Sequence, residues 1–119
     1  MCCLILNGPQ MWDVLSATRV TYLAAVLDGR PLILPLWYEL DVKAEIPAVL
    51  VRVRQSSMLL RALAQSKQVC MAFSLLRESS VDSVLLWGEA AAGEAQGGIV
   101  PLRVTPSELS GRRFLLREM

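Results

Sequence analysis

The sequence predicts a single β-dominated (α+β) domain, in which six antiparallel strands close fully or partly into a barrel beside two to three short helices. The chain has 119 residues, the size of one domain. Short apolar runs of strand length alternate with turn signals, and Asp28-Gly29 is a strong hairpin turn. Six strands in so small a domain favour closure, because a closed sheet leaves no exposed edge.

The first half of the chain predicts a helix followed by a hairpin. Apolar side chains recur at helical spacing over residues 10–18, and two apolar runs, 21–27 and 32–38, flank the turn. Pro31 and Pro35 have no amide hydrogen to donate to a neighbouring strand. We therefore expect the second strand to begin at the turn and to be bulged or unpaired on one side near its middle.

The third strand shows almost perfect alternation over residues 48–54, after a charged loop. One face would carry valines and the other would carry Leu50, Arg52 and Arg54. A serine caps the helix that follows, and three further strands are expected over residues 68–76, 84–92 and 99–105.

The whole chain, residues 1–119, is expected to form one domain with two appendages. An apolar extension covers residues 1–9, and we expect Met1 to Leu6 to pack against the barrel or a partner subunit, since a free apolar hexapeptide would favour aggregation. A tail covers residues 106–119, and Pro106 to Leu109 begins a short turn or helix there.

Composition points to self-association and excludes several function classes. Hydrophobic residues make up 54% of the chain, more than so small a domain can bury, which predicts an apolar patch and a homodimer. A net charge of +1 without a basic stripe argues against a nucleic-acid partner, and no apolar run has the length of a membrane span. No signal peptide is evident, so a cytoplasmic protein is expected.

Catalytic and metal chemistry find little support in the sequence. Histidine is absent, which removes the common nucleophile pairs and histidine metal sites. The three cysteines match no metal-binding spacing, so no metal is predicted, and we expect reduced thiols with Cys70 in the core. Glu39 with Asp41, and Glu89 with Glu94, lie at strand ends where solvated carboxylates are expected. No catalytic residue is predicted.

Two groups of residues are the best candidates for binding. Arg52 and Arg54 share a strand face, and Ser56 and Ser57 follow at a helix start, where guanidinium, hydroxyl and free N–H groups suit a phosphate. The alternative is a solvated strand face with a serine cap. Trp37, followed by Tyr38, forms either a wall for a planar ligand or packing in the core or a dimer interface.

The residues from Asp28 to Tyr38 resemble a motif of the pyridoxamine 5'-phosphate oxidase-like, FMN-binding split-barrel family. The family's second hairpin strand has the pattern Gly-x-Pro-x-x-x-Pro-hydrophobic-aromatic, which Gly29, Pro31, Pro35, Leu36 and Trp37 match. The segments 61–71 and 87–90 also resemble the family's helix with its following strand and a later strand, and the resemblance spans roughly residues 11–105.

The resemblance implies a split barrel that forms a two-fold dimer with FMN at the interface, and a flavin-dependent oxidoreductase of unknown substrate. Carried over by position, Leu36 and Trp37 would face the flavin ring. The phosphate would lie near Arg52, Val53 and Ser57, with Arg54 and Ser56 beside them.

Three positions depart from the family pattern. Leu59 stands where a lysine is common, Ala62 where an asparagine is usual, and Val53 where a threonine is frequent. One alternative is therefore a cofactor-free split-barrel dimer with a binding or structural role. Another is a split barrel that takes a different phosphorylated or planar ligand in the same cleft.

Overall fold

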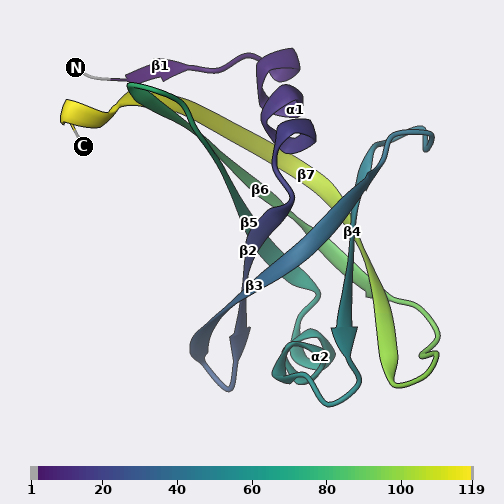
Figure 1. The fold of residues 1–119 in the computed structure, drawn as a ribbon. Helices are drawn as coiled ribbons and strands as arrows, with labels where there is room; N and C mark the ends of the chain where they lie inside the picture. The colour runs from purple at the N-terminus through teal and green to yellow at the C-terminus, as the bar shows by residue number, and fades with distance from the viewer. Residues whose placement is uncertain (1–2, 119) are drawn as a thin grey trace.

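The computed structural model describes residues 3–118 as a six-stranded antiparallel barrel with one added edge strand (Figure 1). The sheet order is β1-β7-β4-β3-β2-β5-β6, and pairing of β6 with β7 closes the ring. The six barrel strands match the predicted number, and the seventh, β1, was not predicted as a strand. The elements are β1 (Cys3–Ile5), α1 (Gly8–Ala17), β2 (Val20–Leu27), β3 (Arg30–Asp41), β4 (Ala48–Arg54), α2 (Met58–Gln65), β5 (Gln68–Leu76), β6 (Ser80–Ala92), β7 (Ile99–Leu115) and a 3-10 turn (Leu116–Glu118).

The β2–β3 hairpin confirms the predicted turn. Asp28 and Gly29 have φ values of 53° and 76°, and two consecutive positive φ angles match the twist of a tight hairpin. β3 begins directly after the turn and pairs with β2 as far as Trp37, but it pairs with β4 only from Tyr38 onward. The long half of β3 that contains both prolines is therefore paired on one side, as expected.

The alternation in β4 places its valines in the core and its arginines outside. Val49, Val51 and Val53 are buried, whereas Arg52 and Arg54 are exposed. The following helix, α2, lies at one end of the barrel (Figure 1) and buries Leu59, Ala62 and Leu63 against the core. The Ser57 hydroxyl caps it by accepting a 3.1 Å hydrogen bond from the backbone N–H of Leu59.

The predicted turn or helix at Pro106 to Leu109 is wrong, because β7 continues through these residues. A β-bulge absorbs the proline: Trp87 lies opposite Glu108 and Gly88 opposite Pro106, so that Ser107 is an extra residue. A Cβ at Gly88 would lie 2.3 Å from the backbone oxygen of Thr105, which only glycine avoids. The bulge lets one strand run from Ile99 to Leu115.

The N-terminal extension packs on the barrel where the structure describes it. β1 pairs with residues 112–114 of β7, which confirms the expected packing for that segment, whereas Met1 and Cys2 lie outside the described residues. Gly8 and Pro9 belong to α1 rather than to the extension. Asn7 and Gln10 cap this helix through reciprocal hydrogen bonds of 2.8 and 2.9 Å, and the helix lies close on β7 at Gly111.

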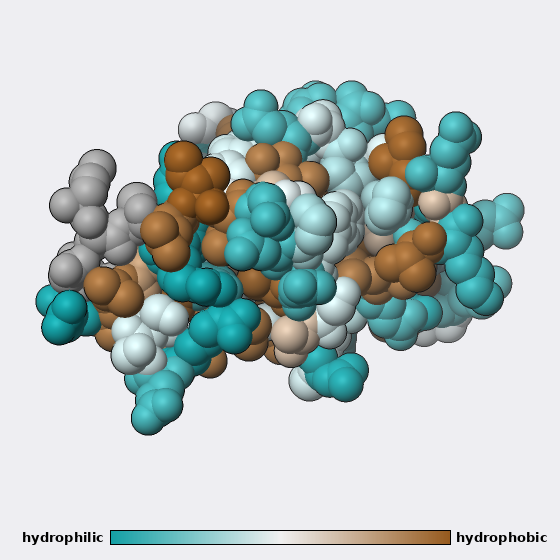
Figure 2. Space-filling view, turned by 90° about the horizontal axis from the view of Figure 1, so that it is seen from above, coloured by the Kyte–Doolittle hydropathy of each residue, from teal (hydrophilic) through white to brown (hydrophobic). Residues whose placement is uncertain are grey.

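An apolar strip covers the outer face of β2, β3, β5 and β6. Its exposed members are Val20, Tyr22, Val26, Ile33, Trp37 and Leu85. Cys70 also lies on this outer face and is half-buried, so its predicted place in the core is wrong, although partial burial raises the pKa of its thiol. Seen from above, over α1 and the termini, hydrophobic residues instead form separate clusters between hydrophilic ones (Figure 2).

None of the helices in residues 3–118 has both the length and the apolar character required to cross a membrane.

Candidate functional site

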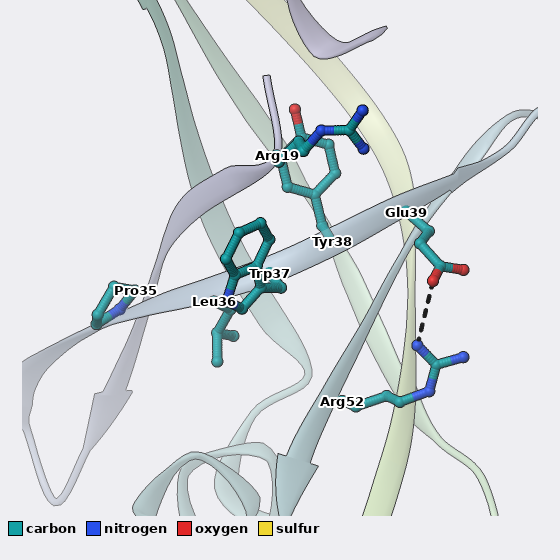
Figure 3. A pocket seen from close by; sticks show the side chains of 7 residues that line it. All are labelled: Arg19, Pro35, Leu36, Trp37, Tyr38, Glu39 and Arg52. Atoms are coloured by element: carbon teal, nitrogen blue, oxygen red, sulfur yellow. Dashed lines mark hydrogen bonds and ion pairs between the residues drawn. The ribbon is translucent and has the colours of Figure 1, made fainter. Parts of the chain in front are cut away.

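A hollow of about 430 Å³ lies on the outer surface where β3 parts from β4 (Figure 3). It forms there because the pairing of β3 with β4 stops at Tyr38, so the two strands separate on the Trp37 side of that residue. β3 contributes most of the wall, Arg19 precedes β2, and Arg52 projects from β4. The lining residues are Arg19, Pro35, Leu36, Trp37, Tyr38, Glu39 and Arg52.

Trp37 gives the hollow its large flat surface. The residue is 72% exposed, which is unusual for a tryptophan, and it lies opposite Val20 at one end of the apolar strip. A large exposed aromatic side chain beside a hollow is typical of a surface that another molecule covers. The hollow and the strip are therefore continuous through Trp37.

Two guanidinium groups border the hollow, and they differ in their surroundings. Nη1 of Arg52 lies 3.5 Å from a carboxylate oxygen of Glu39, and both side chains are mostly exposed. Arg19 has no carboxylate within ion-pair distance among residues 3–118. Arg52 also lines two further hollows over β4 and β7, of about 220 and 640 Å³. Anionic groups would thus find positive charge on either side of Trp37.

Tyr38 forms the inner wall and fixes α1 to the barrel. Its hydroxyl donates a 2.7 Å hydrogen bond to the carbonyl of Leu15, and it also bonds the Thr18 hydroxyl. Its ring packs edge-on against Phe73, with centroids 5.0 Å apart. Burial raises the pKa of Tyr38 although Thr18 and Arg19 oppose the shift, so the phenol stays protonated near neutral pH. It is a structural group rather than a base.

The structure places three of the predicted binding residues at the hollow. Trp37 and Arg52 project into it, and Leu36 lines it while its side chain is partly buried against the core. The other four lie elsewhere. Val53 faces the interior and is 5% exposed, and the end of β4 and the start of α2, outside this hollow, carry Arg54, Ser56 and Ser57.

The departures from the family pattern are buried positions. Leu59 and Ala62 are 0% and 1% exposed, on the side of α2 that packs on the core. A lysine side chain in place of Leu59 would start inside the hydrophobic core. These positions therefore offer the hollow no polar contact.

Sequence reasoning missed Arg19 as a lining residue, named Tyr38 only as the neighbour of Trp37, and treated Glu39 only as a solvated carboxylate. The register of the hairpin could have indicated Arg19, because the backbone N–H of Tyr38 bonds the Arg19 carbonyl at 3.1 Å. Glu39 could have been paired with Arg52 only after the β3–β4 register was known.

Metal chemistry finds no support in the part of the chain that the structure describes. Within residues 3–118, no three histidine, cysteine, aspartate or glutamate side chains gather in a way that could hold a metal ion.

Comparison with known proteins assigns the fold. An FAD-binding protein from Mesorhizobium loti superposes with a TM-score of 0.84 at 17% identity, covering 95% of this chain and 99% of that one. An FAD-binding protein from Mycobacterium smegmatis gives 0.78 at 23% identity, covering 94% and 98%. A candidate pyridoxamine 5'-phosphate oxidase from Corynebacterium glutamicum gives 0.77 at 16% identity, covering 97% and 95%. The chain has the fold of the pyridoxamine 5'-phosphate oxidase-like split barrels.

The resemblance that the sequence predicted is thus confirmed at the level of the fold. A scan of family models and a search of curated proteins give no match. At these identities the likeness concerns the split-barrel architecture, so the ligand and the activity have to be argued from the chain's own residues.

Proposed function

We propose that this split barrel binds FMN in the Trp37 hollow, at the interface of a homodimer, and acts as a flavin-dependent oxidoreductase. The observation that carries the proposal is the pairing of an exposed indole with a guanidinium in one hollow. Trp37 is 72% exposed, and Arg52 lines the same hollow from the next strand. A flavin mononucleotide combines the two features that such a hollow accepts, a planar ring and an anionic end.

The residues present fit this ligand. A volume of about 430 Å³ lies within the ~300–1,000 Å³ range of small-molecule sites, and an indole face suits stacking with a planar ring. Arg52 can form charge-assisted hydrogen bonds with a phosphate. A bound flavin supplies the electron-transfer chemistry, while the protein orients the ring, holds the anionic end and excludes water. The relatives named as FAD-binding support a flavin as the ligand class.

The proposed dimer would use the apolar strip. Its exposed side chains lie on the outer face of four adjacent strands, and Trp37 belongs to both the strip and the hollow. A second copy placed on this face would bury apolar surface and would cover the open side of the hollow. The ligand would then lie between the two subunits.

A cofactor-free dimer is the alternative, and one observation favours it. The apolar side chains of Leu59, Ala62 and Val53 are buried where the family pattern has polar residues, which leaves fewer groups to hold a phosphate. Another phosphorylated or planar ligand in the same hollow is the remaining possibility. Absorbance of the purified protein in the flavin region separates the first two readings.

The decisive experiment titrates the protein with FMN and with riboflavin, following flavin fluorescence. Arg52→Ala should weaken FMN binding by about 10–100-fold, because a hydrogen bond to a charged group contributes ~1.5–3 kcal/mol. Riboflavin has no phosphate, so its affinity should stay within about twofold. Arg54→Ala is the matched control, since Arg54 shares the strand face but lies outside the hollow.

Three results would contradict parts of this proposal. Absence of binding of either flavin to the wild type leaves the cofactor-free dimer as the better account. Loss of FMN affinity in Arg54→Ala rather than in Arg52→Ala would move the phosphate to the end of β4. Equal loss of both flavins in Arg52→Ala would mean that Arg52 supports the ring or the fold.

The dimer has its own test. Light scattering at micromolar concentration should give twice the chain mass of 13.1 kDa. Tyr22→Arg places a charge in the apolar strip, outside the hollow, and should shift the protein toward monomers. If the wild type is a monomer, the proposal of a ligand site between two subunits is wrong.

A further inference from the structure

We infer that Glu39 competes with the ligand's phosphate for Arg52, so that it limits how strongly the hollow favours a dianionic ligand over an uncharged one. This inference rests on the proposed binding of a flavin in the hollow. Glu39, for which the sequence predicts only a solvated carboxylate at a strand end, would then be a specificity-determining residue.

The geometry brings Glu39 and Arg52 together in the hollow itself. Both residues line it, and the carboxylate oxygen of Glu39 lies 3.5 Å from Nη1 of Arg52 (Figure 3). Glu39 projects from the outer face of β3, two residues beyond Trp37 and on the same side of the strand. A phosphate that reaches Arg52 must therefore approach a carboxylate as well.

The two charges are weakly held together, which lets a ligand displace one of them. The side chains of Arg52 and Glu39 are 62% and 66% exposed, and a single long contact between exposed groups contributes little to folding. Repulsion between the Glu39 carboxylate and a phosphate grows with the charge of the phosphate. A phosphate monoester carries about −1.5 to −2 at neutral pH and is penalised most, whereas an uncharged ligand is not affected.

Asp41 provides a matched control on the same strand face. It lies two residues beyond Glu39, pairs with Arg103 at 2.8 Å and does not line the hollow. Removing its charge changes the net charge of the protein by the same amount as removing that of Glu39. Any effect confined to Glu39 must therefore come from its place in the hollow.

The experiment measures the dissociation constants of FMN and riboflavin for the wild type, Glu39→Gln and Asp41→Asn at low ionic strength. Glu39→Gln should tighten FMN by about three- to tenfold, from the loss of one exposed carboxylate near the phosphate. Riboflavin affinity should stay within about twofold, and Asp41→Asn should leave both values near those of the wild type.

Other outcomes overturn the inference in distinguishable ways. Unchanged FMN affinity in Glu39→Gln, when the wild type binds FMN and Arg52→Ala loses it, refutes the competition and leaves the proposed function intact. An equal gain in Asp41→Asn reduces the effect to net charge. Weaker binding of both flavins to Glu39→Gln assigns the residue a role in shaping the hollow. If no variant binds either flavin, the proposed function and the inference fail together.

Discussion

Arginine meets carboxylate in two contrasting settings in this barrel. Asp82, on β6, is 2% exposed at its side chain and accepts hydrogen bonds from Arg113 at 2.6 and 2.9 Å and from Arg77 at 3.1 Å. Glu39 has one contact with Arg52 at 3.5 Å, and both side chains remain in solvent. In one region a buried carboxylate is thus bonded at both oxygens by two partly exposed arginines, and in the other the two groups form a loose, exposed pair.

The difference distinguishes a carboxylate that stabilises the fold from charged groups that are free to contact a ligand. Asp82 lies directly opposite Arg113 on β7, and Arg77 comes from the β5–β6 turn, so the cluster connects this hairpin to the last strand. Every polar atom of the Asp82 carboxylate is used within the protein. Around the Trp37 hollow, by contrast, the charged groups are exposed, which leaves them available to a ligand.

The largest expected effect comes from removing the charge of the buried Asp82 carboxylate. Asp82→Asn should lower the free energy of unfolding by about 2 kcal/mol, because it weakens the charge-assisted hydrogen bonds that the buried carboxylate accepts from two arginines. Glu39→Gln, the corresponding change in the exposed pair, should alter it by less than about 0.5 kcal/mol. Urea unfolding followed by tryptophan fluorescence measures both. Similar small losses of unfolding free energy in the two variants would show that the Asp82 cluster stabilises the fold no more than the exposed pair does.

Lowering the pH tests the contribution of the Asp82 charge in a second way. The hydrogen bond from Arg113, aided by Arg77, holds the pKa of Asp82 below its usual range in the folded protein. The ionised carboxylate therefore stabilises the fold above its unfolded pKa of ~3.9, and this stabilisation is lost as the pH falls through the lower folded value.

The difference in stability between wild type and Asp82→Asn should accordingly be constant from about pH 5 to 8 and shrink below about pH 4. Arg103 also lowers the pKa of Asp41, so Asp41→Asn should show a change of the same sign. We expect that change to be smaller, because this carboxylate is less buried than that of Asp82. A difference that widens in acid would mean that burial, rather than the arginines, dominates at Asp82.

Local sequence patterns predicted much of the fold, but they did not predict which charged residues pair with each other. The Asp28-Gly29 turn and the alternation in β4 are local, and the structure confirms both. The continuation of β7 past Pro106 could not be predicted in this way, because the bulge that accommodates the proline depends on pairing with β6. Likewise Asp82 and Arg113 are 31 residues apart and meet only through that register.

The candidate site was predicted in part for the same reason. Trp37 and Arg52 could be predicted from their residue types, their places on the expected strands and the family resemblance, all of which are visible in the sequence. Their common hollow depends on where β3 and β4 separate, which no local pattern reveals. The family pattern aligns Leu59 with a lysine. In the structure this side chain is buried in the core, so it contacts no ligand in the hollow.

A smaller effect is expected from Trp37→Ala, within the exposed region. Loss of the stacking surface should weaken FMN and riboflavin alike by about tenfold, since one aromatic stacking contact contributes ~1–3 kcal/mol. Stability should change little because Trp37 is 72% exposed. Titration above the dimer dissociation constant separates ring binding from assembly. A loss limited to FMN would place the phosphate, rather than the ring, against Trp37.

Tyr38 lies between the two settings, and its variant should lower stability moderately and should have the smallest effect on flavin affinity. Tyr38→Phe removes the hydroxyl that bonds Leu15 and Thr18 but keeps the ring against Phe73. The expected cost is about 1 kcal/mol, the usual net contribution of one buried hydrogen bond.

A double-mutant cycle with Thr18→Val shows what that hydroxyl does. If the two side chains act mainly on each other, the double variant should be less destabilised than the sum of the single ones, by about 0.5 kcal/mol or more. Flavin affinity should stay near the wild-type value in all three variants, because the hydroxyl bonds α1 and does not point into the hollow. Parallel losses of stability and flavin affinity would show instead that α1 positions the wall of the hollow through Tyr38. Ligand binding in the exposed hollow would then depend on the buried hydrogen bonds of the Tyr38 hydroxyl.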